Sequence, residues 1–260
     1  MSATEHRTAD RYATIVVVGG GCYGGYYVRQ LQRAARAGAI VAERILVVDR
    51  DPRCAVAQEQ SAENGATAIA VQVDVAEWQE FFPRYLSRAA EQGAALARDA
   101  IVPSPLMPHL MAEWLVQRAI ERWPARSVTT CAFEHLPSVP WERAGADGTH
   151  YVSFATWTCP INCIEPRICP VTRDVRDWSL PVALETHRDE RRKTSAAVDV
   201  AVMHCRHRAY GVGMFDTADV LAADERIRAA GESADAEVII GTVSHCHGAL
   251  TRLWIGVPAR

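Results

Sequence analysis

Residues 14–24 read Thr-Ile-Val-Val-Val-Gly-Gly-Gly-Cys-Tyr-Gly, and this stretch decides the fold of the first half of the chain. The β-branched run Thr14–Val18 is typical of a buried parallel strand. Gly19, Gly21 and Gly24 follow it with G-x-G-x-x-G spacing. In that pattern the first glycine permits a tight turn, the second lets the backbone approach a pyrophosphate, and the third lets a helix pack on the strand. We therefore predict a strand, a phosphate-binding loop, and a helix whose free N–H groups face the phosphates.

A helix and a second strand are expected after the glycine loop. Residues 23–37 contain no proline and are followed by Gly38, a typical helix C-cap, and Ile45–Val48 form another buried strand. This β-α-β order requires a parallel pair of strands. Asp49 lies at the end of the second strand, where a carboxylate can accept hydrogen bonds from ribose hydroxyls.

The glycine loop and Asp49 together make about the first 75 residues resemble the NAD(P)-binding Rossmann superfamily. The resemblance implies NAD or NADP as the cofactor. The residues expected to bind it are Gly19, Gly20, Gly21, Cys22, Tyr23, Gly24, Asp49 and Arg50. The charge of Asp49 favours NAD because it repels a 2′-phosphate, whereas Arg50 and Arg53 leave NADP open. Two alternatives also stay open, a glycine turn without a ligand and a site for S-adenosylmethionine; FAD is disfavoured because the second half shows no second FAD fingerprint.

The alternation of strands and helices continues more weakly along the chain. Strands are expected at residues 68–73, 100–102, 198–203 and 237–243, and helices at residues 78–86, 107–123 and 219–230. We predict an α/β fold with a Rossmann-like, doubly wound and mainly parallel sheet, which a Cys/Pro-rich C-terminal half extends or packs against. The expected domains are a nucleotide-binding domain of residues 1–126 and a Cys-rich, metal- or cluster-binding α/β region of residues 127–260.

The second feature of the sequence is a cysteine loop, residues 158–170, in which Cys159, Cys163 and Cys169 are spaced C-x3-C-x5-C and two of them precede proline. Prolines leave such a loop few free backbone torsions, so it can preorganise three thiolates. Cysteine followed by proline loosely resembles the iron–sulfur loops of bacterial ferredoxins, although those use tighter spacings. This implies a cluster, most simply [4Fe–4S]; structural zinc and reduced or redox-active thiols stay open as alternatives.

Two dense His/Cys groups follow predicted strands. They are His204-Cys205-Arg206-His207 and Ser244-His245-Cys246-His247. Both lie at the carboxyl ends of strands, the edge at which open α/β sheets bind ligands. Cys246 is the first candidate for a fourth metal ligand. His245, His247 and His204 are candidates for catalytic proton transfer, because an ordinary imidazole titrates near neutral pH. For any single histidine, a buried polar contact is the competing interpretation.

Composition gives broad limits. The 260 residues are 49% hydrophobic and 23% charged with a formal net charge of -3, which gives no reason to expect nucleic acid or a membrane surface as a partner. No apolar run approaches the length of a membrane span, and the polar N-terminus, residues 1–12, is expected to be a disordered lead-in rather than a secretory signal. We therefore expect a cytoplasmic protein whose eight cysteines are thiols or metal ligands. The charged run Arg188–Lys193 is expected to be a solvated loop.

The leading functional hypothesis is an NAD(P)-dependent oxidoreductase that carries an iron–sulfur cluster and acts on a small molecule. A homo-oligomer is left open by the sequence. Two hypotheses from other classes compete with it. One is a non-catalytic NAD or redox sensor, resembling the nucleotide-binding regulators of potassium transport. The other is a non-redox enzyme in which a three-cysteine cluster serves as a Lewis acid or a sulfur carrier.

Overall fold

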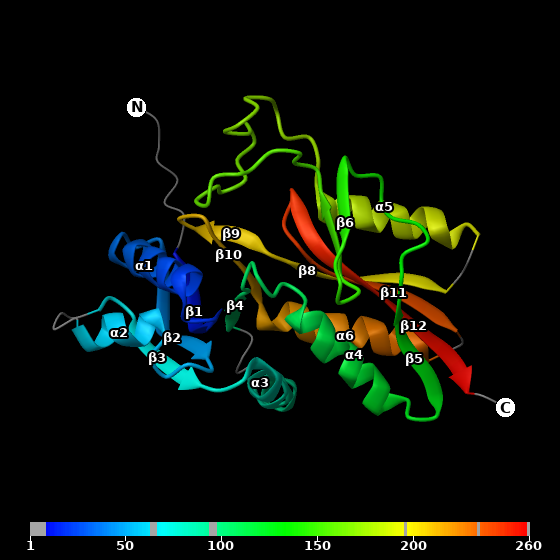
Figure 1. Cartoon of the computed structure of the whole chain (residues 1–260), viewed down its shortest axis with the longest axis horizontal. Coiled ribbons are helices and arrows are strands. Elements are labelled where there is room, and N and C mark those ends of the chain that lie inside the picture. Colours follow the sequence, from blue (N-terminus) through cyan, green and yellow to red (C-terminus); the bar gives the residue numbers. More distant parts are fainter. Residues whose placement is uncertain (1–8, 63–66, 94–97, 195–196, 233–234, 259–260) are drawn as a thin grey trace.

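Two mixed sheets and six helices form a mixed α/β protein in the computed structural model, which describes residues 9–62, 67–93, 98–194, 197–232 and 235–258 (Figure 1). The first sheet has the strand order β3-β2-β1-β4-β10-β9. Its strands are β1 (Asp10–Val18), β2 (Ile40–Asp49), β3 (Ala70–Val75), β4 (Ala100–Val102), β9 (Arg206–Ala209) and β10 (Val212–Asp216). The first four strands are parallel, whereas β10 runs antiparallel to both β4 and β9.

Helices cover both faces of the first sheet. Helices α1 (Cys22–Arg36) and α2 (Ala55–Ala62) lie on one face, where Val28 and Leu31 of α1 pack with Ile15 and Val47 of the sheet. Helix α3 (Trp78–Gln92) packs on the other face. The alternation of side chains along β1 explains this sandwich, since every residue from Thr14 to Val18 is buried and successive residues point to opposite faces.

The second sheet has the order β6-β7-β12-β11-β8, and β5 also pairs with β12. Its strands are β5 (Arg126–Cys131), β6 (Trp141–Ala144), β7 (His150–Ser153), β8 (Val198–His204), β11 (Ala236–Val243) and β12 (His247–Pro258). Only β11 and β8 are parallel; the other pairs are antiparallel. Helix α5 (Leu180–Arg192) covers one face, and α4 (Leu110–Arg122) and α6 (Thr217–Gly231) cover the other.

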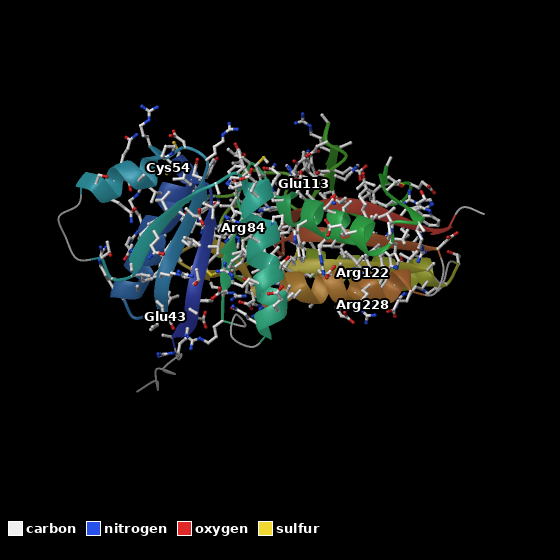
Figure 2. The ribbon with its side chains drawn as sticks, turned by 90° about the horizontal axis from the view of Figure 1, so that it is seen from below. Glu43, Cys54, Arg84, Glu113, Arg122 and Arg228 are labelled. Atoms are coloured by element: carbon white, nitrogen blue, oxygen red, sulfur yellow. The ribbon has the colours of Figure 1, made fainter. Side chains whose placement is uncertain are left out.

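One hydrophobic core joins the two sheets. It contains Ile101 of the first sheet, Phe215 of β10 and Ile240 of the second sheet, all fully buried together with residues of α3, α4 and α6. Helices α4 and α6 lie side by side in this layer (Figure 2), and Arg122 donates to both carboxylate oxygens of Asp224 at 2.9 and 2.8 Å. The shared core fixes the position of the carboxyl ends of the strands from both sheets.

The predicted α/β class is confirmed, and the strands expected at residues 14–18, 45–48, 100–102, 198–203 and 237–243 lie within β1, β2, β4, β8 and β11. The second half both extends the first sheet and packs a further sheet against it, as expected, but most of its strand pairs are antiparallel, so the expectation of mainly parallel pairing is wrong there. There the long hairpin of β11 and β12 builds a separate, mostly antiparallel sheet, while β9 and β10 extend the first one. None of the helices in the described ranges is long and apolar enough to cross a membrane.

Two local predictions are also wrong. The charged run Arg188–Arg192 is the last part of α5, where Arg188 pairs with Glu185 one turn earlier and with Asp199 of β8. Opposite charges at helical spacing stabilise a helix, and this outweighed the polar character of the run. The expected lead-in is ordered from Asp10, where β1 begins beside β2; residues 1–8 lie outside the described part of the chain.

Candidate functional site

The glycine loop lies between β1 and α1, as the sequence predicts. Gly19 has a φ of 85°, a left-handed conformation that favours glycine, and a Cβ at Gly24 would overlap the carbonyl oxygen of Gly19. A Cβ at Gly21, by contrast, would meet nothing within 4 Å. Gly21 is also the N-cap of α1, which has no side-chain cap and no acidic residue in its first turn. The N-terminus of α1 therefore keeps free N–H groups and open space beside them.

Asp49 holds this loop in place. One of its carboxylate oxygens accepts the N–H of Gly20 at 2.7 Å, and the other accepts the N–H of Asp51 at 2.9 Å. Each oxygen retains a second lone pair, so the carboxylate can still accept a hydroxyl hydrogen bond. The neighbouring Arg50 is exposed and lies 3.9 Å from Glu77. Asp49 thus orients the glycine loop through these two backbone hydrogen bonds.

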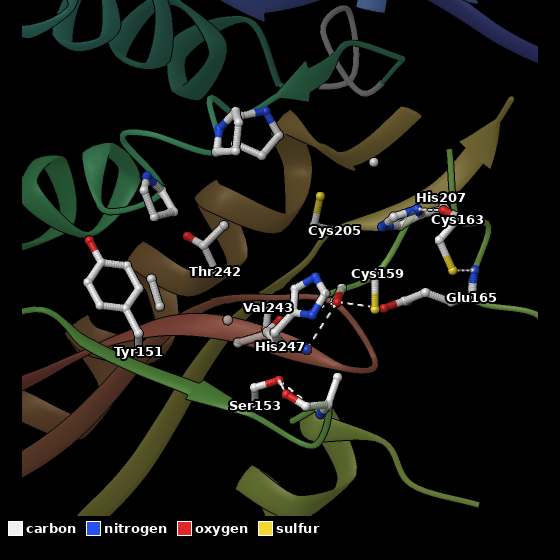
Figure 3. A pocket seen from close by; sticks show the side chains of 18 of the residues that line it. Tyr151, Ser153, Cys159, Cys163, Glu165, Cys205, His207, Thr242, Val243 and His247 are labelled. Atoms are coloured by element: carbon white, nitrogen blue, oxygen red, sulfur yellow. Dashed lines mark hydrogen bonds between the residues drawn. The ribbon is translucent and has the colours of Figure 1, made fainter. Parts of the chain in front are cut away.

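A cavity of 760 Å³ lies where the carboxyl ends of four strands meet (Figure 3). The first half of the chain contributes Tyr23 and Tyr27 of α1, directly after the glycine loop, and Pro103 after β4. The second half contributes Cys159 and Cys163 of the cysteine loop. Cys205, His207 and His247, from the segments after β8 and β11, complete its polar wall. Ligands of open α/β sheets bind at this edge of the strands, so the cavity is the best candidate for a functional site.

Glu165 anchors the cysteine loop against the β11–β12 hairpin. Its carboxylate accepts the hydroxyl of Ser244 at 2.7 Å and the backbone N–H groups of His245 and Cys246, both at 3.1 Å. Burial alone would raise the pKa of Glu165, but the Ser244 hydrogen bond, the charge of His207 and the two backbone donors outweigh it and lower this pKa below its usual value. Only 8% of Glu165 is exposed, so it is a buried anchor rather than the surface carboxylate that a glutamate in a loop normally is.

The three cysteines of the loop have different surroundings. The thiol of Cys163 accepts the N–H of Glu165 at 3.3 Å. Burial raises the pKa of Cys159, and the nearby Cys163 and Cys169 raise it further. Burial would also raise the pKa of Cys169, but N–H groups of Thr172 and Val171 outweigh it and lower this pKa. All eight cysteines are free thiols.

The structure does not gather the predicted metal ligands. Cys246 does not line the cavity; its thiol accepts the indole N–H of Trp178 at 3.4 Å, and burial raises its pKa to about 12. Within the described ranges, no three His, Cys, Asp or Glu side chains lie close enough together to hold a metal ion. As they stand, Cys159, Cys163, Cys169 and Cys246 therefore do not form a ligand set, and the cluster stays a prediction from the sequence.

The histidines separate into two groups. His204 and His245 pack edge to face with ring centroids 4.6 Å apart, and His245 Nδ1 lies 3.0 Å from the Ser179 hydroxyl. Burial, followed by the charge of His245, lowers the pKa of His204 to about 4. Neither ring lines the cavity. Of the predicted catalytic histidines, only His247 does so, and burial lowers its pKa.

Three cavity residues had no individual role assigned from the sequence: His207 and Cys205 were named only as members of a His/Cys group, and Thr242 was not named. Cys205 lies between β8 and β9, and His207 lies two residues later in β9, which turns away from β8 toward the first sheet. His207 donates Nδ1–H to the carbonyl oxygen of Cys163. Thr242, near the end of β11, lines the cavity with a buried hydroxyl. The period-two alternation of strands points to the first two residues; nothing in the sequence distinguishes Thr242 from other strand threonines.

Comparison with known proteins adds one relationship. Residues 111–256, more than half of the chain, match the model of the AF_1314_C family, described as "Uncharacterized protein, C-terminal domain". The comparisons with curated proteins and with solved structures gave no significant match. The matched range begins in α4 and contains the cysteine loop and both His/Cys groups.

Proposed function

The chain belongs to the AF_1314_C family, and we propose that it is a nicotinamide-dinucleotide-dependent oxidoreductase. In this proposal, β1 to β4 form a Rossmann-like nucleotide-binding unit. The parallel order β3-β2-β1-β4, the glycine loop after β1 and the acidic end of β2 support it. The observation that carries the proposal is the cavity, because one wall follows the glycine loop and the other holds thiols and imidazoles.

The chain's own residues have distinct tasks in this proposal. The N-terminus of α1 binds the pyrophosphate through backbone N–H groups, and Asp49 accepts hydrogen bonds from the ribose. Tyr23 and Tyr27 flank the route from the glycine loop into the cavity. A bound nicotinamide supplies or accepts a hydride.

His207 is the group best placed to move the accompanying proton. Its Nδ1–H is held by the Cys163 carbonyl, so in the neutral ring Nε2 is the unprotonated nitrogen. Protonated at Nε2, His207 can donate a proton to a substrate oxygen that receives a hydride on the attached carbon; neutral, it can accept that proton in the reverse direction. His247 lines the same cavity and is the second candidate. No step passes through a metal centre, since the described donors do not converge.

Binding and turnover of nicotinamide nucleotides test this proposal. We expect NADH to bind with micromolar affinity in calorimetry and to be oxidised in the presence of an organic acceptor. Asp49→Asn should weaken NADH binding more than NADPH binding, because the lost charge discriminates against a 2′-phosphate. Tight NADH binding without turnover across a broad acceptor panel would favour the sensor instead, and binding of S-adenosylmethionine alone would contradict the proposal.

A further inference from the structure

We propose that the cavity binds an uncharged, largely apolar molecule that carries one small polar group, and that Thr242 is the hydrogen-bonding partner of that group. The inference rests on the proposed function in one respect, since it identifies this molecule as the substrate of the hydride transfer. Binding itself requires only the cavity. The two ideas therefore fail separately.

The charges around the cavity exclude an anionic ligand. None of the described residues that line it is a lysine or arginine. Its one carboxylate, Glu165, is engaged by the Ser244 hydroxyl and by two backbone N–H groups. A carboxylate or phosphate that entered would lose hydration and would meet no permanent opposite charge, since only the imidazoles of His207 and His247 could supply one, which is unfavourable. A substrate that carries such a group is therefore expected to be rejected.

The remaining walls favour apolar contact. Three aromatic side chains from different elements line the cavity: Tyr27 of α1, Trp141 of β6 and Tyr151 of β7. Pro103 and Pro105 line the part that follows β4. A volume of 760 Å³ suits a small organic molecule. Aromatic rings and prolines provide flat apolar surfaces with few competing hydrogen-bonding groups. This wall composition selects for a hydrophobic, often planar, ligand.

Thr242 marks the polar end of the ligand. Only 6% of the residue is exposed, and its hydroxyl oxygen is buried without a hydrogen-bond partner among the described residues. Figure 3 shows the Thr242 side chain among those that line the cavity. A buried hydroxyl without a partner is unfavourable, so such groups in proteins are usually satisfied by a ligand or water. A hydroxyl or carbonyl oxygen on the bound molecule would satisfy Thr242.

Equilibrium dialysis with three matched probes tests the inference. The probes are naphthalenemethanol, which is uncharged with one hydroxyl, naphthoate, which is an anion, and methylnaphthalene, which has no hydrogen-bonding group. We expect the wild-type protein to bind the alcohol at least tenfold more tightly than naphthoate. Thr242→Val preserves the side-chain shape and should weaken binding of the alcohol about fivefold, the equivalent of one neutral hydrogen bond, without weakening binding of methylnaphthalene. Thr130→Val, an exposed threonine of β5 outside the cavity, is the matched control and should change neither.

Each outcome is informative. Equal binding of naphthoate and the alcohol would overturn the charge argument, and an equal effect of Thr242→Val on the alcohol and methylnaphthalene would overturn the role of Thr242. A melting temperature at or above that of the wild type shows that Thr242→Val is folded. A protein that binds the alcohol but not NADH keeps this site and loses the proposed function. A protein that binds NADH but none of the probes keeps the nucleotide-binding part of the proposed function and loses this site.

Discussion

Glu165→Gln should loosen the joint between the cysteine loop and the β11–β12 hairpin. In the wild type, one carboxylate oxygen accepts Ser244 Oγ and Cys246 N, and the other accepts His245 N at 3.1 Å. An amide can keep the first two bonds, but its NH2 group then faces the N–H of His245, so two donors oppose each other. Losing one bond and leaving a buried donor unpaired costs about 1–3 kcal/mol.

Urea unfolding measures this loss. With a slope of roughly 2–3 kcal/mol per molar, this loss should lower the unfolding midpoint by about 0.3–1.5 M. Glu190→Gln removes the same charge from an exposed position of α5 and should shift the free energy of unfolding by less than about 0.5 kcal/mol. If Glu165→Gln and Glu190→Gln have the same midpoint as the wild type, Glu165 does not anchor the loop, and the account of the cavity wall is wrong.

Three further predictions concern the histidine pair, the core and the cysteine loop. Burial and the surrounding His245, Arg206, Arg208 and Glu165 bring the pKa of His204 to about 4. The unfolded chain protonates this imidazole near pH 6.5, whereas the folded protein does so only near pH 4. The free energy of unfolding should therefore fall as pH drops from 6.5 to 4, by about 1–2 kcal/mol at pH 5. The difference in unfolding free energy between pH 7 and pH 5 should be smaller in His204→Leu and unchanged in the exposed control His135→Gln. An equal pH dependence in both variants would contradict the role of His204. Phe215→Ala should lower the free energy of unfolding by about 3–5 kcal/mol, because the ring is fully buried in the core between the two sheets, whereas Val75→Ala, 53% exposed, should change it by less than about 0.5 kcal/mol. The cluster hypothesis rests on the sequence alone, and it requires that protein purified without oxygen contain iron and sulfide that Cys159→Ser, Cys163→Ser and Cys169→Ser each reduce. A colourless protein with stoichiometric zinc would remove the iron–sulfur hypothesis.

The first half of the fold could be predicted because its signals are local. The buried parallel strand Thr14–Val18 is a continuous β-branched run, and the glycine spacing that follows it predicts a tight turn into a helix. The sheet of the second half could not be predicted from the sequence, because its strand pairing is long-range. Strand β12 is a long strand with three neighbours, β11, β7 and β5, and its register depends on pairing between residues more than 100 positions apart, such as Arg252 with Cys131. No short window of sequence contains that information.

In the site, too, local sequence signals identified some residues, whereas long-range contacts determined others. The His/Cys groups after β8 and β11 could be found because they end predicted strands, but which histidine faces the cavity depends on where β9 turns. That turn brings in His207 and leaves His204 against His245. Glu165 was missed for a different reason. Its partners Ser244, His245 and Cys246 are about 80 residues away, and an isolated glutamate in a loop is normally exposed.

Gly21→Asp gives the most direct measurement of the central claim, that the glycine loop binds a dinucleotide. Its new side chain would meet no protein atom within 4 Å of Cβ, and aspartate is a preferred N-cap, so the stability of the protein should stay equal or rise by a few tenths of a kcal/mol. The same carboxylate occupies and repels the pyrophosphate position, so calorimetry should show NADH affinity falling by more than about tenfold.

Gly38→Ala is the matched control at the other end of α1. Its φ of 70° makes the substitution cost about 1 kcal/mol of stability, while NADH affinity should be unchanged. A stable Gly21→Asp protein should therefore lose NADH, while a destabilised Gly38→Ala protein should keep it. NADH bound equally well by the wild type and Gly21→Asp, or by neither, would contradict the central claim.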